Sequence, residues 1–499
     1  MLAWTIYLSF IGAIAVSIMP AKSAAAARIT ALLTTLLGLG IAVVAVAQQP
    51  SGQLLTIARK PWIPTLGIEY HLAADGISLV MVLLTGIAAV AGVLFSWNID
   101  RRVKDFFALY LILIGAVYGV FLSFDLFDLF VFYEIAIIPK YFLIAIWGST
   151  RREYAAMKLV LYSFAGSALV LAGLIAAYVV SGGRTLSLDA LAHFPFPAHF
   201  QMWAFPLVFV GFAVLAGMWP FHTWAPTGHA AAPTAASMLL AGVVMKLGAY
   251  GCLRVAMMLF PHGLDSWGFH VLGFGSWQQV FAVLAVIGIV YGASIALVQK
   301  DLKFVVGYSS VSHMGFVLLG LMTLNQIGMS GGVYQMFSHG IIAGLLFAVV
   351  GRMVYERTHT RDLQELSRIP LARLIPFAAV TFVLAFMASI GLPGFTGFIA
   401  ELEVLIGSWR AFPWMSWIAG LGILIGIAFS WRALQATFFG EAETVSEPLP
   451  AITLPERLGA CLLLASTIAL GLYPRLLMGL ILPALNGPLF EQLRRSGWR

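Results

Sequence analysis

Charged and imidazole side chains inside otherwise apolar runs are the residues of this sequence with the clearest chemical potential. Glu134 lies within LFVFYEIAIIP, Lys246 within LLAGVVMKLGAYG and Glu401 within GFIAELEVL, while His313 and His339 lie in two further apolar runs. An ionised side chain at the centre of a bilayer costs about 2.5–3.5 kcal/mol on insertion scales, so such residues persist where they pair, face water or carry ions. Carboxylate, ammonium and imidazole groups can all exchange protons near neutral pH when burial and neighbours tune them. Their spread over several runs is therefore typical of a chain of proton donors and acceptors.

Each of these residues also has a purely structural interpretation. Glu134 and Lys246 could form an interhelical ion pair that only fixes packing, and His313 and His339 could be core histidines with satisfied hydrogen bonds. For Glu403 we favour the structural interpretation.

Four further polar residues lie near the same runs. Asp125 and Asp128 are close to a helix end, where we expect them to be solvated. His222 and His229 flank an interrupted helix and are candidates for gate or exit groups.

Membrane-spanning helices are the elements that must position these residues. The chain has 499 residues, of which 61% are hydrophobic and 10% charged, and its mean hydropathy is +0.96. A soluble protein of this length would need a more charged surface, and apolar runs of about 20 residues are long enough to span a bilayer. We expect about fourteen transmembrane helices, over residues 2–19, 26–47, 77–98, 106–123, 126–148, 155–181, 203–221, 231–257, 275–298, 302–324, 328–355, 371–408 with a break, 412–435 and 456–480.

The distribution of basic residues supports this arrangement. If the N-terminus lies outside, the outer loops contain only Arg59, Lys60, Arg184, Arg254 and Arg410, and the C-terminal tail adds a few arginines. The positive-inside rule then places both termini on the outer, periplasm-like face. The inner loops contain Lys22, Arg28, Arg101, Arg102, Lys104, Arg151, Arg152, Lys158, Lys300, Lys303, Arg352, Arg357, Arg361, Arg368, Arg373, Arg432 and Arg457.

Several classes of function find no support in the sequence. Cys252 and Cys461 each stand alone in an apolar stretch, and there is no GxGxxG after a strand, no Walker motif and no cysteine cluster for an iron–sulfur centre. We therefore expect no cofactor and no metal on this chain, and electron carriers on other chains. Loop arginines explain the net charge of +7 better than nucleic-acid binding does.

The chain is predicted to form a single membrane domain over residues 1–499, because no polar linker is long enough to mark a soluble domain. Two of the expected helices contain a matching interruption, one near Trp219-Pro220 and one over residues 391–394. Helices broken by Pro or Gly in two halves indicate an internal repeat around an ion path at the membrane midplane.

Five blocks of sequence resemble the chain M family of bacterial NADH-quinone oxidoreductase (respiratory complex I), one of its three antiporter-like subunits. The motifs HTRDL and SSVSHMG favour this family over the related L and N chains and over Mrp-type sodium/proton antiporters. The blocks are FVFYEIAIIPKYFLIAIWG, WPFHTWAPTGHAAAPTAASMLLAGVVMKLGAYGCLR, QKDLKFVVGYSSVSHMGFVLLG, SHGIIAGLLFAVVGRMVYERTHTRDL and GLPGFTGFIAELEVL.

The resemblance implies an all-α membrane fold with two inverted five-helix repeats, each with a discontinuous helix. It divides the chain into three N-terminal helices (1–98), repeat one (106–257), repeat two (275–435), and a last helix with a tail (456–499). It also implies a bacterial inner membrane protein that assembles with L-like and N-like chains within the lipid bilayer.

The resemblance further implies a proton path that couples electron transfer in the complex to proton pumping. Carried over by motif, its members are Glu134, Lys246, His313, His339 and Glu401. The enzyme would be a proton-translocating NADH:quinone oxidoreductase of which this chain is a subunit without redox chemistry of its own.

One member of the family's set is missing. A lysine that pairs with the helix 5 glutamate falls on Leu215 here, and the usual PDAH is replaced by residues 226–229, PTGH. Lys140, six residues after Glu134, is an unusual extra charge. At about 100° per residue the two do not share a helix face, so direct pairing within the helix is not expected. Either Lys140 replaces the lost lysine, or the input half of the path is altered and the chain is a divergent second chain M.

Three other functions share this architecture. An Mrp-like cation/proton antiporter subunit is the first alternative, and a membrane subunit of a hydrogenase-type, formate-linked or ferredoxin-linked complex is the second. A partner of a bicarbonate or substrate transporter is the third and has the least specific support.

Overall fold

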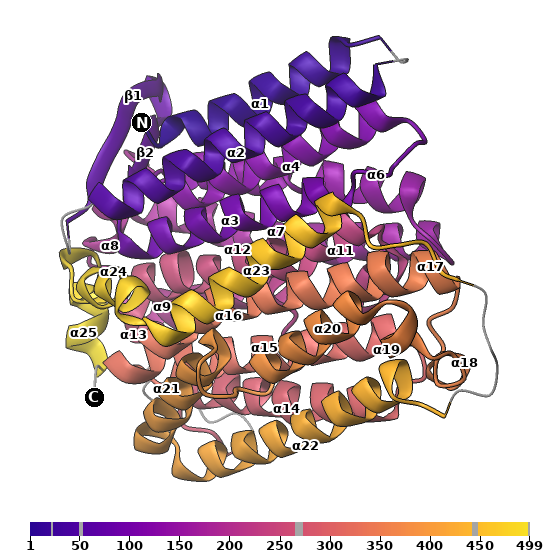
Figure 1. Ribbon diagram of the computed structural model, residues 1–499. Helices are drawn as coiled ribbons and strands as arrows, with labels where there is room; N and C mark the ends of the chain where they lie inside the picture. The colour runs from indigo at the N-terminus through magenta and orange to yellow at the C-terminus, as the bar shows by residue number, and fades with distance from the viewer. Residues whose placement is uncertain (21–22, 49–52, 265–272, 442–447, 498–499) are drawn as a thin grey trace.

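A bundle of long helices forms almost the whole molecule in the computed structural model (Figure 1). The described residues are 1–20, 23–48, 53–264, 273–441 and 448–497. Within them, twelve helices are long and apolar enough to cross a membrane, and α1 and α20 are shorter apolar helices.

Each expected span falls on a helix or an interrupted helix, so the predicted helical membrane fold is confirmed. Exposed large apolar residues on α2, α7 and α22 show that the outer helices face lipid rather than water. In order, the spans are α1 (Ala3–Ile18), α2 (Ala24–Gln48), α3 (Gly76–Phe95), α4 (Val103–Leu122), α5 (Leu126–Ile135) with α6 (Ile137–Trp147), α7 (Arg152–Val180), α9 (Ala198–Ala216), α11 to η3 (234–257), α14 (Trp277–Val298), α15 (Leu302–Met322), α16 (Gln326–Ala348) with η4 (Val349–Tyr355), α20 (Pro376–Ser389) with α21 (Thr396–Ala411), α22 (Pro413–Phe438) and α23 (Leu454–Leu472).

Three spans form the centre of the bundle. The apolar stretches of α3, of α11 to η3, and of α16 with η4 are entirely buried within the protein. A helix that is apolar all round and enclosed by other helices belongs to the core. Lys246 and His339 lie on two of these central spans.

Two helices are interrupted at the predicted places. The chain leaves α9 at Gly217 and resumes in α10 (Trp224–Ala231), and it leaves α20 near Gly391 and resumes in α21. Both glycines have a positive φ, 80° and 71°, a conformation that other residues adopt at a cost of roughly 1–2 kcal/mol. The next amide bonds back by five residues in each case, from Met218 to Ala213 and from Leu392 to Met387, which is the helix-ending motif that favours glycine.

Three segments of the central spans have π-helical rather than α-helical hydrogen bonding. They are η2 (Leu240–Val244), η3 (Cys252–Met257) and η4. Together with α11 (Thr234–Leu239) and α12 (Met245–Gly251), η2 and η3 build the span that carries Lys246. Isolated π turns inside α-helices frequently occur at functional sites.

A β-hairpin occupies the polar stretch at 48–74, for which no element was predicted. Strands β1 (Leu55–Ile63) and β2 (Ile68–Ala74) pair in antiparallel fashion around a turn at η1 (Pro64–Leu66). The hairpin lies at the same end of the bundle as both chain termini, and α17 (Glu356–Thr358) and α18 (Leu363–Leu366) lie at the opposite end (Figure 1).

Asp125 and Asp128 were expected to be solvated, and this expectation is wrong. Both are buried, because their carboxylates accept hydrogen bonds from backbone amides of β2. Asp125 accepts from the amide of Glu69 at 3.2 Å and Asp128 from that of His71 at 2.9 Å. Asp125 also caps α5 through the amide of Phe127 at 2.9 Å. The two aspartates therefore attach the hairpin to the helical bundle.

Arg254, assigned to an outer loop from the sequence, instead lies in η3 and is fully buried. Its guanidinium forms an ion pair with Asp75, the N-cap residue of α3, and packs over the ring of Phe490 at 5.4 Å. A buried arginine needs such a partner. The pair joins α3, η3 and the C-terminal segment.

The last expected span, 456–480, does not continue as one helix. Helix α23 ends at Leu472, and Pro474 precedes α24 (Arg475–Leu485). Proline lacks the amide needed inside a helix, so the chain turns there. The division into an N-terminal part and two inverted repeats with the boundaries given above stays a prediction.

The hairpin attachment gives a testable pH dependence. Burial raises the pKa of Asp125 from 3.8 to about 6, although backbone amides favour the ionised form. As pH rises, the unfolded chain therefore loses the Asp125 proton at a lower pH than the folded chain does. Because the folded chain binds more protons between about pH 4 and about pH 6, the free energy of unfolding falls over this range, by up to about 3 kcal/mol. We expect Asp125→Asn, which keeps the helix cap, to show a smaller loss of thermal stability across this window. Thermal unfolding in detergent at a series of pH values measures it.

The exposed Asp100 supplies the matched control. Asp100→Asn should leave the pH dependence of the wild-type protein unchanged. An Asp125→Asn profile identical to the wild-type profile would contradict the assignment.

Candidate functional site

Lys246 and His339 form the centre of a row of titratable side chains. Lys246 on α12 is fully buried, and its Nζ lies 2.7 Å from Nδ1 of His339 on α16. The same Nζ donates a hydrogen bond to the carbonyl of Ala241 in η2. In the described part of the chain, Lys246 forms no ion pair with a carboxylate. Burying an ammonium without an opposite charge is costly, and transfer of its proton to His339 would move the charge along the row.

Close backbone packing brings these two helices together. Gly242 in η2 faces Gly340 in α16, and a Cβ on Gly340 would lie 2.6 Å from the carbonyl oxygen of Gly242. Only glycine permits this approach, and Gly340 directly follows His339. The contact is therefore what allows the side chain of Lys246 to reach the imidazole.

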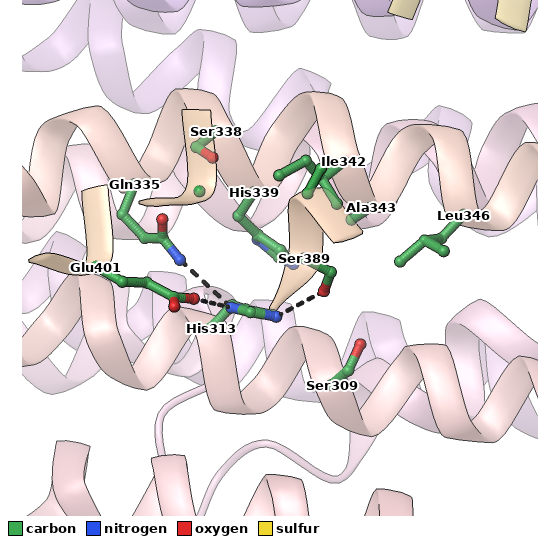
Figure 2. A pocket seen from close by; sticks show the side chains of 12 residues that line it. Ser309, His313, Gln335, Ser338, His339, Ile342, Ala343, Leu346, Ser389 and Glu401 are labelled. Carbon is green, nitrogen blue, oxygen red and sulfur yellow. Dashed lines mark hydrogen bonds and ion pairs between the residues drawn. The ribbon is translucent and has the colours of Figure 1, made fainter. Parts of the chain in front are cut away.

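His313 continues the row from His339. The two imidazoles stack with their centroids 5.4 Å apart and their planes inclined by 28°. His313 on α15 contacts Oε1 of Glu401 at 3.2 Å through Nδ1, and its Nε2 lies 3.1 Å from the hydroxyl of Ser389 (Figure 2). Glu401, on α21 just after the interruption, is also buried.

The surroundings of His313 suit two protonation states. Its Nδ1 lies 3.3 Å from the amide nitrogen of Gln335, a donor, and 3.2 Å from the carboxylate of Glu401, an acceptor. One ring nitrogen cannot accept from the first and donate to the second at the same time. A neutral Nδ1 accepts from Gln335, whereas a protonated Nδ1 donates to Glu401, so His313 has a hydrogen-bond partner in either state.

Two narrow cavities adjoin this pair of residues. The first is lined by His313, His339, Gln335 and Glu401, among others (Figure 2). The second lies between Glu401 and α22. Each has a cavity volume of about 10 Å³, about what one water molecule needs. Single water molecules could therefore bridge the side chains.

Glu134 stands apart from this row. It is partly buried on α5, and within the described residues neither it nor Lys140 forms an ion pair. Lys140 on α6 is buried, its Nζ has no hydrogen-bond partner, and the charges of Lys140 and Glu134 interact electrostatically. A break in the helix at Ala136 separates the two residues. Leu215 is buried in α9 beside the backbone of Gly248 in α12.

His222 and His229 lie on either side of the start of α10. Both are buried, and neither imidazole has a hydrogen-bond partner among the described residues. The ring of His222 lies 5.0 Å from that of Tyr291, and the ring of His229 lies 5.1 Å from that of Phe347. His229 interacts electrostatically with Lys246, whereas His222 lies beside Tyr291 of α14 and Tyr308 of α15.

Three polar residues near the row were not singled out from the sequence. Gln335 lies four residues before His339 on α16, a spacing that places both on one helix face, and this signal could have found it. Ser389 precedes the second interruption and only the fold brings it to His313. Lys303 was counted as a loop residue, yet it is buried in the first turn of α15. Glu403, expected to be structural, accepts a hydrogen bond from Ser330 at 3.0 Å.

A lipid-facing helical bundle with a buried row of proton-exchanging groups and two interrupted helices defines a polytopic ion-translocating membrane protein. Residues 123–426 match the family described as NADH:quinone oxidoreductase/Mrp antiporter, TM. NADH-quinone oxidoreductase subunit M of Rhodobacter capsulatus is 36% identical over 441 residues, covering 85% of this chain and 82% of the relative. The chain therefore belongs to the family of membrane subunits of NADH:quinone oxidoreductases and Mrp antiporters.

Solved structures agree with this assignment. A chain of respiratory complex I from Thermus thermophilus with bound NADH superposes with a TM-score of 0.88 at 27% identity and covers 99% of both chains. A chain of the Mrp complex from a Dietzia species has a TM-score of 0.84 at 21% identity, over 99% of this chain and 98% of that one. The second likeness shows a shared fold.

The glycine contact between η2 and α16 leads to a stability prediction. Gly340→Ala should lower the stability by about 1–3 kcal/mol, because the new Cβ would overlap a backbone oxygen that cannot move freely. Thermal unfolding of the purified protein in detergent measures the change.

Gly344, one turn further along α16, is the matched control because a Cβ there meets nothing within 4 Å. Gly344→Ala should be neutral or stabilising by up to about 1 kcal/mol, since alanine favours helix interiors over glycine. Equal melting temperatures for the two variants would show that the contact does not limit the packing.

Proposed function

We propose that this chain conducts protons as a subunit in the membrane arm of a bacterial complex I-like NADH:quinone oxidoreductase. The observation that carries the proposal is the unbroken series of contacts from Lys246 through His339 and His313 to Glu401. Each member can hold a proton and lies close enough to the next for transfer directly or through one water molecule. The family assignment and the likeness to a complex I chain support the setting.

Proton transfer along the row needs no net change of charge in the protein core. A proton on Lys246 passes to Nδ1 of His339. Nε2 of His339 then releases a proton, which reaches Nδ1 of His313 through a water molecule in the cavity that both rings line. Nδ1 of His313 gives this proton to the carboxylate of Glu401. Nδ1 of His313, now neutral, again accepts a hydrogen bond from the Gln335 amide, and the imidazole returns to its starting state. The two small cavities that Glu401 lines would hold the water molecules that accept the released proton.

The remaining parts of the proposal concern the setting of the chain. It would sit in the bacterial inner membrane, with both termini and the hairpin on the periplasmic face, and would contact L-like and N-like subunits. Electron transfer and quinone reduction would take place on other chains. The proteins that co-purify with a tagged copy test this, because redox subunits support complex I and antiporter subunits alone support the Mrp-like alternative.

For the first half of the path we propose that Lys140 serves as the charge partner of Glu134 in place of the lysine lost at Leu215. Lys140 is a buried ammonium group that has no hydrogen-bond partner among the described residues, a costly arrangement that is rarely kept without a function. It acts on Glu134 electrostatically. Leu215 cannot hold a proton, so a proton cannot pass from Glu134 to Lys246 by the family's usual intermediate.

The central row can be tested with substitutions that remove or trap the proton. Lys246→Met removes the carrier, and Lys246→Arg keeps a charge that is never released at physiological pH. We expect both, and Glu401→Gln, to lower the number of protons pumped per electron by the complex in proteoliposomes, with normal assembly. Pumping is measured by quenching of a pH-sensitive dye alongside electron transfer.

Lys300 is an exposed lysine outside the row and provides the control. Lys300→Met should pump like the wild-type complex. Full pumping by Lys246→Met would exclude the proposed path.

Lys140 is tested in the same assay. Lys140→Ala should lower the pumping ratio, because Glu134 would lose the nearest positive charge, and Lys140→Arg should restore part of it by keeping that charge. Lys300→Ala is again the control. If Lys140→Ala pumps as well as the wild-type complex, the replacement hypothesis fails and the altered-input hypothesis stands.

A further inference from the structure

A cleft lined by residues that include Tyr355 and Glu356 opens beside α17. Figure 1 shows α17 and α18 at the end of the bundle opposite the β-hairpin. The cavity volume of the cleft is about 260 Å³, enough for many water molecules. The exposed residues Asn98, Asp100 and Arg101 lie at its mouth. The buried Lys303 lines the cleft at its deep side, next to the turn between α10 and α11. We name this cleft the vestibule.

Lys303 is the titratable group by which the vestibule meets the protein interior. It is 2% exposed, and its Nζ donates to the carbonyl of Ala232 at 2.8 Å. The nearby Asp301 does not neutralise it directly, because that carboxylate caps α15 and pairs with Arg361 at 3.1 Å. Lys303 is thus a buried amine with a neutral partner on one side and the vestibule on the other.

His229 belongs to the same backbone neighbourhood as the Lys303 contact and interacts electrostatically with both Lys303 and Lys246. Its imidazole is fully buried, and among the described residues neither ring nitrogen has a hydrogen-bond partner. The hydroxyl of Ser237 ties the intervening backbone together, since it donates to the carbonyl of His229 at 2.8 Å and to that of Ala232 at 3.1 Å. The carbonyl of Ala232 that accepts from Lys303 is therefore fixed by the same hydroxyl that binds the carbonyl of His229.

We propose that the vestibule is the proton uptake site of this chain and that protons pass from Lys303 to His229 and then to Lys246. A hydronium ion in the vestibule protonates the Lys303 amine, the ammonium gives its proton to the His229 imidazole, and the imidazolium gives it to Lys246. Each step moves one proton and consumes nothing. The route joins the central row at Lys246 without using Glu134. This inference rests on the proposed function of the row.

A structural role for Lys303 predicts something different. Cations cap the carbonyls at the C-terminal end of α10, where Arg361 donates to the carbonyl of Ala230 at 2.7 Å and Lys303 to that of Ala232. Positive charge at a helix C-terminus is stabilising by itself. If capping were its only role, arginine at position 303 would serve as well as lysine.

Lys303→Arg separates the two roles, because arginine keeps the capping charge but does not release a proton. In the assembled complex in proteoliposomes, we expect Lys303→Arg and Lys303→Met to lower the pumped protons per electron to the level of Lys246→Met. Arg361→Lys is the matched control and should pump like the wild-type complex, because it keeps a cation on the same helix end.

His229→Leu serves as the second variant in case position 303 proves sensitive for assembly. It replaces the buried imidazole by an apolar side chain that cannot carry a proton, and it should reproduce the loss of pumping. Pumping by Lys303→Arg at the wild-type level, with Lys246→Met defective, overturns the uptake route and leaves the row intact. Pumping by Lys246→Met at the wild-type level overturns the proposed function, and the uptake route with it.

Discussion

An ammonium group at the centre of an apolar bundle is the constraint on which the arrangement depends. Lys246 is held by a backbone carbonyl and an imidazole instead of a carboxylate, so its charge is placed where it can move but is not neutralised. The π turn of η2 places the carbonyl of Ala241, and the contact between Gly242 and Gly340 brings α16 within reach. Both features serve the position of one side chain.

The interruption between α20 and α21 places Glu401, the last residue of the row. Gly391 ends α20 with a positive φ, and a Cβ there would lie 2.9 Å from a carboxylate oxygen of Glu401. The interruption therefore turns the chain and also makes room for the acid that faces His313. The first interruption has the same helix-ending motif at Gly217, but there the residue facing the Lys246 helix is Leu215. The two interruptions share backbone geometry and differ in chemistry.

Sequence patterns predict most of this architecture because lipid imposes simple rules on it. Apolar runs of about 20 residues locate the spans, and the glycines and prolines locate both interruptions. The hairpin escaped prediction because strands of mixed polarity outside the membrane resemble a loop in composition. Asp125 and Arg254 were misplaced for the same reason, because a charged residue near a helix end is ordinarily expected to be solvated. Here both are buried, since Asp125 accepts a backbone amide hydrogen bond and Arg254 forms an ion pair with Asp75. The pairing of His313 with Ser389 depends on tertiary contact and has no local signal.

A second entry point for protons explains how the chain can work with a leucine at position 215, where the family has a lysine. A lysine at that position would connect Glu134 to Lys246, and its absence would block a path that had only one input. The vestibule places a second amine, Lys303, at the end of a chain that reaches Lys246 through His229. A row supplied in this way does not need the connection to Glu134 for its protons. Glu134 and Lys140 would then influence the row only through their electric field and would pass no protons to it. A buried charge in a low-dielectric interior shifts the proton affinity of distant groups.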